Sequence, residues 1–463
     1  MVRKLSVSLA VFTCSVLALA LTAGCTQPNP GKPDGQEDPV ELAPCTAKIQ
    51  VTEDWVYQSK PSITFNVENP NSVAATAEAK VRISTDLKKE VTTVVVTGEV
   101  PANGTKQIVV TTEQDLDPGF YKAACFIDKQ SAKIFTFGIS PEKIVSAPDK
   151  QADFDSFWET AKKQLASLDM KAELTEIPSR STSARKVYMV EMQSVPDGPS
   201  GDPVTVRGYY LEPQDGKKHP VIMHFFGYDT QPPYGAIPKI SCPGGGSSAE
   251  FAEFYLSNRG QQINARSASL RADGIEKDFA NTYGDWFAFN FGKKDGYYYR
   301  GAFMDCVQAI RFIATRPTSD LNNIFAEGSS QGGAFSYAAA ALSEYPLNAI
   351  APCVAFLGDF PDYFRIVDWP ANTAHSNQGS MTDEEMYAFL SYFDTKNLAT
   401  RINCSVIACC CLQDGTCPPH THMAPYNNLA TKDKEIYYYP LLQHTTPSNW
   451  PSKYEAFFRA RIK

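Results

Sequence analysis

The spacing of apolar residues changes character near residue 141. Before it, short segments alternate polar and apolar positions, as Ser62-Ile-Thr-Phe-Asn-Val67 does, and turn sequences such as Asn69-Pro-Asn separate them. This alternation is typical of half-buried β-strands. Six to eight strands in about a hundred residues predict an all-β, immunoglobulin-like domain over residues 45–140. No catalytic group stands out there, so a spacer or docking role is favoured, with glycan binding as the alternative.

From residue 141 onward, apolar runs of strand length alternate with stretches of helical period. Ala152–Ser167 repeats its apolar residues at helical spacing, with Asp153 as the expected N-cap. Such alternation predicts a mainly parallel sheet with helices on both faces, so residues 141–463 are expected to form an α/β domain. An antiparallel pair opens the strand series, Val187–Met192 with Val204–Leu211. The other expected strands are Pro220–Phe226, Leu347–Leu357, Cys404–Leu412 and Glu435–Tyr439, and the other helices Tyr299–Ala314 and Ser452–Arg461.

One turn in this domain has the sequence of a nucleophile elbow. The apolar run Ile324-Phe-Ala leads into Gly328-Ser-Ser-Gln-Gly332, and an alanine-rich helix follows. In a G-x-S-x-G elbow the central serine sits on a strained turn, and glycines flank it because strand and helix run close together. Ser330 is therefore the candidate nucleophile. The alternative is a glycine-rich turn with an ordinary surface serine.

A serine hydroxyl needs a base and an acid, and in α/β-hydrolases both follow the serine along the chain. Among six histidines, His444 lies in a polar loop just beyond the last expected strand and is the candidate base. Asp414 directly follows the strand Cys404–Leu412 and is the candidate acid, with a simple turn aspartate as the alternative. His420 and His422 share the loop of Asp414 and suit the base less well; an H-x-H metal pair is the rival interpretation for them.

Ester hydrolysis also needs donors for the developing oxyanion. The backbone N–H of Gln331, directly after the candidate nucleophile, is one. The second is expected from the loop after an earlier strand, where Gly227 lets the backbone come close and Tyr228 offers its N–H. A plain strand-ending turn is the alternative.

The N-terminus has the pattern of an export signal. Arg3 and Lys4 precede the apolar run Leu5–Leu21, and Leu21-Thr-Ala-Gly-Cys25 follows. This resembles the lipobox of bacterial lipoproteins, which implies cleavage before Cys25 and a lipid on its thiol. Residues 1–24 are then a signal peptide and residues 25–44, rich in proline, glycine and charge, a flexible tether. The expected location is a bacterial membrane, on its periplasmic or cell-surface face; the alternative is an ordinary secreted protein.

The charge and the cysteine content of the chain exclude some classes of partner and of covalent cross-link. The chain of 463 residues has a net charge of −8 and no block of lysine and arginine, which argues against nucleic acid as a partner. Its twelve cysteines do not form a disulfide framework, because Cys409-Cys-Cys lie in an apolar run and no C-x-x-C occurs. Cys45 and Cys125 bracket the first domain, and their pairing stays open.

Six motifs follow one another within residues 141–463: Asp153–Trp158, Asn258–Gln261, Gly296–Gly301, Gly328–Gly333, Asp414–Pro419 and His444. In this order they resemble the acetyl xylan esterase and cephalosporin-C deacetylase family of α/β-hydrolases (carbohydrate esterase family seven). The resemblance implies removal of acetyl groups from xylo-oligosaccharides or related esters without a cofactor or metal. It implies Ser330 as nucleophile, His444 as base, Asp414 as its orienting acid and Tyr228 with Gln331 as oxyanion hole. Homo-oligomers are a further implication.

Some positions depart from the family pattern. Phe226 stands where the family has histidine, while His224 lies two residues earlier, and Thr445-Thr446 replaces Glu-Gly after the base. The segment Pro243–Ser248 is also unusual. These departures are expected at the rim of the pocket, so they leave the sugar and the acyl group open. The alternatives are an esterase or peptidase of the same fold acting on another substrate, or a glycan-binding surface lipoprotein whose hydrolase domain is inactive.

Overall fold

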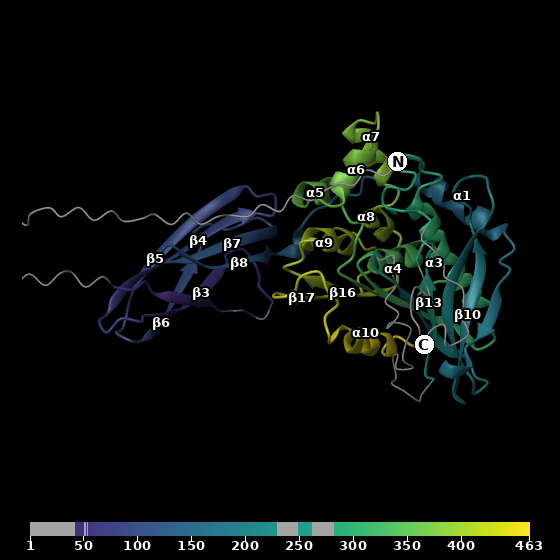
Figure 1. The fold of residues 1–463 in the computed structure, drawn as a ribbon, viewed down its shortest axis with the longest axis horizontal. Coiled ribbons are helices and arrows are strands. Elements are labelled where there is room, and N and C mark those ends of the chain that lie inside the picture. Colours follow the sequence, from purple (N-terminus) through teal and green to yellow (C-terminus); the bar gives the residue numbers. More distant parts are fainter. Residues whose placement is uncertain (1–41, 51, 53, 229–248, 262–281) are drawn as a thin grey trace, which may run out of the picture. The chain divides into compact units, whose positions relative to one another are not determined.

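The computed structural model describes residues 42–463 apart from residues 51, 53, 229–248 and 262–281 (Figure 1). The proposed signal peptide, Cys25 and Pro243–Ser248 therefore lie outside the described residues. Pro44–Lys463 cluster as one unit, and the boundary expected near residue 141 stays a prediction. We use the names β domain for residues 45–140 and α/β domain for residues 141–463.

The β domain consists of two sheets built from eight strands. One sheet has the order β1-β3-β6 and the other the order β2-β8-β7-β4-β5. Alternate residues of β3 are buried, as the polar–apolar pattern predicts. Its description as immunoglobulin-like stays a prediction. The strands are β1 Thr46–Ile49, β2 Val56–Tyr57, β3 Ser62–Glu68, β4 Ala75–Thr85, β5 Glu90–Val100, β6 Thr105–Thr111, β7 Gly119–Ile127 and β8 Gln130–Ile139.

The α/β domain is organised on one sheet of nine strands in the order β17-β16-β15-β14-β12-β13-β11-β10-β9. The strands from β12 to β17 pair with one another in parallel, whereas β9, β10 and β11 pair antiparallel, including β11 with β13. The expected α/β fold with an antiparallel opening pair is confirmed. The strands are β9 Glu173–Glu176, β10 Arg185–Ser194, β11 Val204–Pro213, β12 His219–Phe225, β13 Ala252–Ser257, β14 Ser319–Ser329, β15 Ala349–Cys353, β16 Ser405–Cys411 and β17 Lys434–Tyr439.

Helices cover both faces of this sheet because alternate strand residues point to opposite sides. Ile324 and Ala326 of β14 belong to the core cluster that contains α3 and α4, whereas Phe325 between them packs with Trp450 and Phe458 of α10. The helices are α1 Phe154–Ala166, α3 Tyr298–Ala314, α4 Gln331–Leu342, α5 Phe360–Ile366, α6 Ala371–Asn377, α7 Asp383–Leu390, α8 Thr395–Ala399, α9 Pro419–Asn427 and α10 Trp450–Arg459, with short 3₁₀ turns at Pro141–Lys143 and Pro178–Arg180.

One local prediction is wrong, and another is confirmed in position but not in its hydrogen bond. The strand expected over Leu347–Leu357 ends at Cys353, because Val354 and Leu357 have positive φ and turn the chain out of the sheet. Asp153 stands at the N-cap of α1, but its carboxylate makes no capping bond and instead accepts from Lys294 Nζ at 2.6 Å and from Tyr392.

The R-G-Q segment ties β13 to α3. The fully buried guanidinium of Arg259 donates to both oxygens of Asp305, at 2.9 and 2.7 Å, and to Asp197 at 2.7 Å. Because both partners are charged and dry, removing either one would leave an uncompensated buried charge. The pair therefore fixes the helix that leads into the elbow strand.

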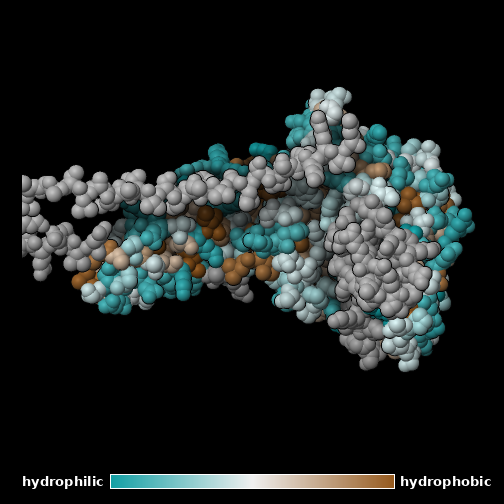
Figure 2. Space-filling view, in the orientation of Figure 1, coloured by the Kyte–Doolittle hydropathy of each residue, from teal (hydrophilic) through white to brown (hydrophobic). Residues whose placement is uncertain are grey.

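The surface differs between the two domains. On the face that Figure 2 shows, hydrophilic residues dominate the α/β domain, and hydrophobic residues are mixed among hydrophilic ones on the β domain. Val95, Val109 and Ile134, on β5, β6 and β8, are among the exposed large apolar residues. Among the described residues, no helix is both long and apolar enough to cross a membrane.

We predict that Gly332→Ala lowers the free energy of unfolding by about 1–3 kcal/mol or more and disables the elbow. A Cβ at this position would lie 2.2 Å from the backbone oxygen of Phe225, which cannot move without shifting β12. Gly415→Ala is the control, because its Cβ would meet no heavy atom within 4 Å. Denaturant unfolding measures both, and equal midpoints would contradict the steric argument.

Candidate active site

Ser330 occupies a strained turn between β14 and α4. Its φ of 58° and ψ of −122° are unusual for a residue with a side chain. The turn is held from both sides, because Ser330 N donates to Cys353 O at 2.9 Å and Ser330 O accepts from Phe356 N at 3.0 Å. A Cβ on Gly328 would approach the backbone of Gly332 to 2.4 Å, so both glycines are required for the close approach of strand and helix.

The structure brings the three candidate residues into one hydrogen-bonded chain. His444 Nε2 lies 3.0 Å from Ser330 Oγ, and His444 Nδ1 lies 2.7 Å from Asp414 Oδ2. Ser330 comes from the elbow, Asp414 from the end of β16 and His444 from the loop after β17. This arrangement lets the imidazole take the serine proton while the carboxylate holds its tautomer.

Asp414 is buried and fully supplied with donors. Its Oδ1 accepts from the backbone N–H groups of Thr416 at 2.9 Å and Cys417 at 2.8 Å, while Oδ2 faces His444. Gly415 follows directly, and the turn is held further by Tyr363, whose hydroxyl donates to Thr416 O at 2.7 Å. Together with His444, these two backbone donors fix the orientation of the carboxylate.

The two candidate oxyanion donors flank the serine. A Cβ on Gly227 would lie 3.8 Å from Ser330 Cβ, so the strand end that carries Tyr228 runs directly beside the nucleophile. Gln331 is the first residue of α4, where a backbone N–H has no carbonyl partner within its own helix. Its side chain is buried and accepts from Tyr299 Oη at 2.9 Å, which anchors the start of the helix.

Aromatic side chains that the sequence interpretation missed surround the Tyr228 side of the site. The Tyr228 ring lies 5.3 Å from Trp369 and 4.9 Å from Trp286, and Trp369 stacks on Phe356 at 5.2 Å. The Tyr228 hydroxyl donates to Asp285 at 2.7 Å, and burial is the main cause that raises its pKa. Trp369-Pro370 offers no periodic signal, so only the folded chain shows its place.

The neighbouring histidines have separate surroundings. His420 and His422 lie in helix α9, not in a loop as expected. His420 Nε2 is 3.0 Å from Asp359, whereas His422 Nε2 is 3.8 Å from Asp414. The two histidines therefore face different partners and do not form a shared H-x-H metal site. His224 is buried inside the sheet between Glu327 at 2.7 Å and Glu253 at 3.1 Å, not at the pocket rim as expected.

One further departure from the family pattern has a defined place, and the state of the cysteines is also clear. Thr446 Oγ1 forms a 2.6 Å hydrogen bond with the hydroxyl of Ser329, which links the loop of the base to the elbow. Cys45 and Cys125 are buried free thiols, so they do not pair. The three consecutive cysteines are buried, as the apolar pattern of β16 predicts.

We predict that His422→Leu flattens the loss of stability on acidification. Burial lowers the pKa of His422 to about 4, against the attraction of Asp414, while an unfolded histidine has a pKa near ~6.5. Between these values the unfolded chain binds more protons, so this group makes the free energy of unfolding fall as pH falls, by up to about 1.4 kcal/mol per pH unit.

Urea unfolding from pH 4 to pH 6.5 measures this slope, with His375→Leu on the surface as the matched variant. Burial opposes the charged forms of His224 and His420, but their carboxylate partners outweigh it and raise both pKa values to about 9. Their effect on the free energy of unfolding therefore changes between pH 6.5 and 9, outside the range of this test. An unchanged acid slope in His422→Leu would refute the assignment.

Comparisons with known proteins show the family of the chain. The family model "Acetyl xylan esterase (AXE1)" matches residues 142–461. Acetyl esterase Axe7A of Xylanibacter ruminicola is 26% identical over 343 residues, which cover 72% of each chain. The acetyl xylan esterases of Paenibacillus sp. R4 and Thermoanaerobacterium sp. JW/SL YS485 superpose with TM-scores of 0.58 and 0.57 at 25% identity, each over 70% of this chain and 98% of theirs. The chain is therefore a carboxylic ester hydrolase that belongs to the acetyl xylan esterase family of α/β-hydrolases.

Proposed function

We propose that this enzyme removes acetyl groups from xylo-oligosaccharides or related acetylated carbohydrates. The single observation that carries the proposal is the hydrogen-bonded chain from Ser330 through His444 to Asp414 at the elbow. The similar enzymes are named acetyl esterase and acetyl xylan esterase, which supports acetyl as the acyl group and a xylose-based sugar as its carrier. Homo-oligomers, which the family resemblance implies, remain a prediction.

In the proposed first step, His444 Nε2 takes the proton of Ser330 Oγ as that oxygen attacks the acetyl carbonyl carbon. The carbonyl oxygen becomes an oxyanion, and the N–H groups of Tyr228 and Gln331 stabilise it. The intermediate then expels the sugar oxygen, which receives the proton from His444, and acetate stays esterified to Ser330. In the second step a water gives a proton to His444 while its oxygen attacks the acetyl carbon. The bond from that carbon to Ser330 Oγ then breaks, Oγ takes the proton back from His444, and the acetyl group leaves as acetic acid.

The surroundings of His444 suit this exchange of a proton. Asp414 accepts hydrogen bonds from two backbone N–H groups, which hold its carboxylate where it can balance the imidazolium that forms beside it. The aromatic residues near Tyr228 exclude water from one side of the site, which strengthens the electrostatic interactions with the oxyanion. The chemistry needs no group beyond these side chains and water.

We predict that Ser330→Ala lowers kcat for acetate release from acetylated xylo-oligosaccharides by at least about 10⁴-fold. Ser329→Ala is the matched control, because this neighbouring serine bonds Thr446 and not His444. If the parent hydrolysed an aryl acetate but released no acetate from the oligosaccharide, the serine esterase mechanism would stand and the proposed sugar substrate would be refuted. Comparable loss in both variants would refute the role of Ser330.

We further propose that a lipid on Cys25 anchors the enzyme to a bacterial membrane, on the periplasmic or cell-surface face. The lipobox-like segment Leu21–Cys25 supports this. Cys25→Ala in the full-length chain, expressed in a bacterium, should move the esterase activity from the membrane fraction to the soluble fraction. A parent protein that is already soluble after signal cleavage would contradict the anchor.

A further inference from the structure

The β domain is fastened to the residue next to the catalytic acid. Gln413 Oε1 accepts from Thr136 N at 2.8 Å, and Gln413 Nε2 donates to Thr136 O at 3.0 Å and to Pro440 O at 2.7 Å. The side-chain amide thus pairs with β8 as a short strand would. The β domain therefore contacts the loop that carries Asp414.

Side-chain amides at the end of α9 bind residues 141–146, the segment that follows β8. Asn427 donates to Pro141 O and Ile144 O, both at 2.9 Å, and Asn428 donates to Ser146 O at 2.7 Å. Backbone carbonyls of the segment are thereby held by helix α9 in fixed positions. These directional hydrogen bonds hold the first residues of the α/β domain, which directly follow β8 of the β domain.

A cavity of about 400 Å³ opens where the two domains meet. Asp86, Lys89 and Tyr121 line it from the β domain, and Asp362, Arg365 and His420 line it from α5 and α9. Helix α5 also carries Tyr363, which bonds the acid loop, and His420 lies six residues after Asp414. The two segments that line the cavity on this side therefore contact or directly follow the loop that carries Asp414.

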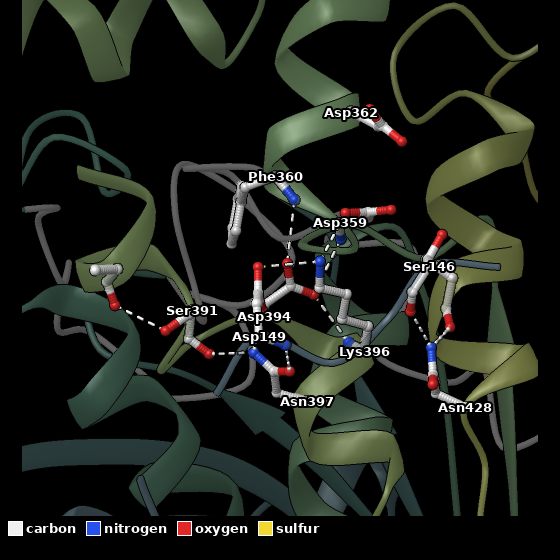
Figure 3. A network of polar contacts seen from close by, with 12 residues as sticks. Ser146, Asp149, Asp359, Phe360, Asp362, Ser391, Asp394, Lys396, Asn397 and Asn428 are labelled. Atoms are coloured by element: carbon white, nitrogen blue, oxygen red, sulfur yellow. Dashed lines mark hydrogen bonds and ion pairs between the residues drawn. The ribbon is translucent and has the colours of Figure 1, made fainter. Parts of the chain in front are cut away.

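Helix α5, which forms one wall of the cavity, is held in place by a buried polar network. Figure 3 shows Lys396 among Asp149, Asp359 and Asp394; its Nζ lies 2.8 Å from Asp359 and 3.1 Å from Asp149. Burial raises the pKa of Asp394 to about 7, and its carboxylate accepts from the N–H of Asp359 at 3.0 Å and of Phe360 at 3.1 Å. This network fixes the first turn of α5.

His420 and Asp362 are positioned by the same network. His420 Nε2 lies 3.0 Å from Asp359 Oδ2 and 3.4 Å from Asp362 Oδ2, and Arg365 Nη1 lies 3.1 Å from Asp362 Oδ1. Asp359, Asp362 and His420 are close enough to hold a metal ion. However, Lys396 and Arg365 already pair with the two carboxylates, which makes a resident cation unfavourable.

A cavity that presents carboxylates and cations side by side suits a neutral ligand with many hydroxyl groups. Each hydroxyl can donate to a carboxylate such as Asp86 and accept from a cation such as Lys89 or Arg365. A charged ligand of either sign would meet groups of its own sign. The volume lies within the range of sites for small ligands.

We propose that this interdomain cavity is a distal sugar-binding subsite, which holds a glycan unit remote from the acetyl ester that reaches Ser330. The inference rests on the proposed function and deepens it, because it assigns a specificity role to the β domain. Binding energy gained there improves recognition of long substrates and leaves small esters unaffected.

The test compares Asp86→Ala and Arg365→Ala in the full mature protein. We expect kcat/KM for long acetylated xylo-oligosaccharides to fall about tenfold, the effect of losing one hydrogen bond to a charged group, with an unchanged value for an aryl acetate. Glu99→Ala in the β domain and Lys293→Ala in the α/β domain are exposed controls of matching charge. Equal values for parent and variants on long substrates would overturn the subsite, as would a parallel fall on the aryl acetate.

A binding measurement separates this inference from the proposed function. Calorimetry with the Ser330→Ala protein and unacetylated xylo-oligosaccharides should show binding that weakens when Arg365→Ala is added. If the parent released no acetate from xylo-oligosaccharides, this binding would still support the subsite while the proposed reaction failed. Binding that requires added Ca²⁺ or Zn²⁺ would point to a metal site and overturn the assignment.

Discussion

The close approach of strand and helix at the elbow is the constraint on which the site depends. Gly328 and Gly332 have no room for a Cβ, and between them Ser330 adopts a positive φ that only surrounding bonds can maintain. Those bonds come from Cys353 at the end of β15 and from Phe356 in the loop that follows it. The nucleophile is therefore positioned by a neighbouring strand, and its exposure follows from strain that the sheet offsets.

The acid and the base are placed by the same sheet through different means. Asp414 ends β16 and is held by the N–H groups of its own turn, so its position is local. His444 follows β17 at the sheet edge and is fixed mainly by what it meets, Asp414 on one side and Ser330 on the other. Parallel neighbours bring both strand ends to one edge, which is why residues 30 apart in sequence meet.

Local patterns were enough to predict the fold class, the elbow and the order of the triad. Period-two alternation, glycines at Gly328 and Gly332 and an aspartate after a buried strand each depend on nearest neighbours along the chain. The sequence could not show which distant group a polar side chain meets. Asp153 stands at the predicted N-cap position, but its carboxylate binds Lys294. His224 binds two glutamates inside the sheet.

The β domain shows the same limit most clearly. Its strands were predictable, but its contact with the acid loop depends on one amide, Gln413, whose partner Thr136 is 277 residues away. A flexible spacer would need no such bond, whereas a wall of the substrate path requires a fixed position. Because Gln413 is adjacent to Asp414, displacement of the β domain would be transmitted to the carboxylate that orients the base. The structure thus shows a contact between the β domain and the acid loop that the alternation pattern of its strands does not predict.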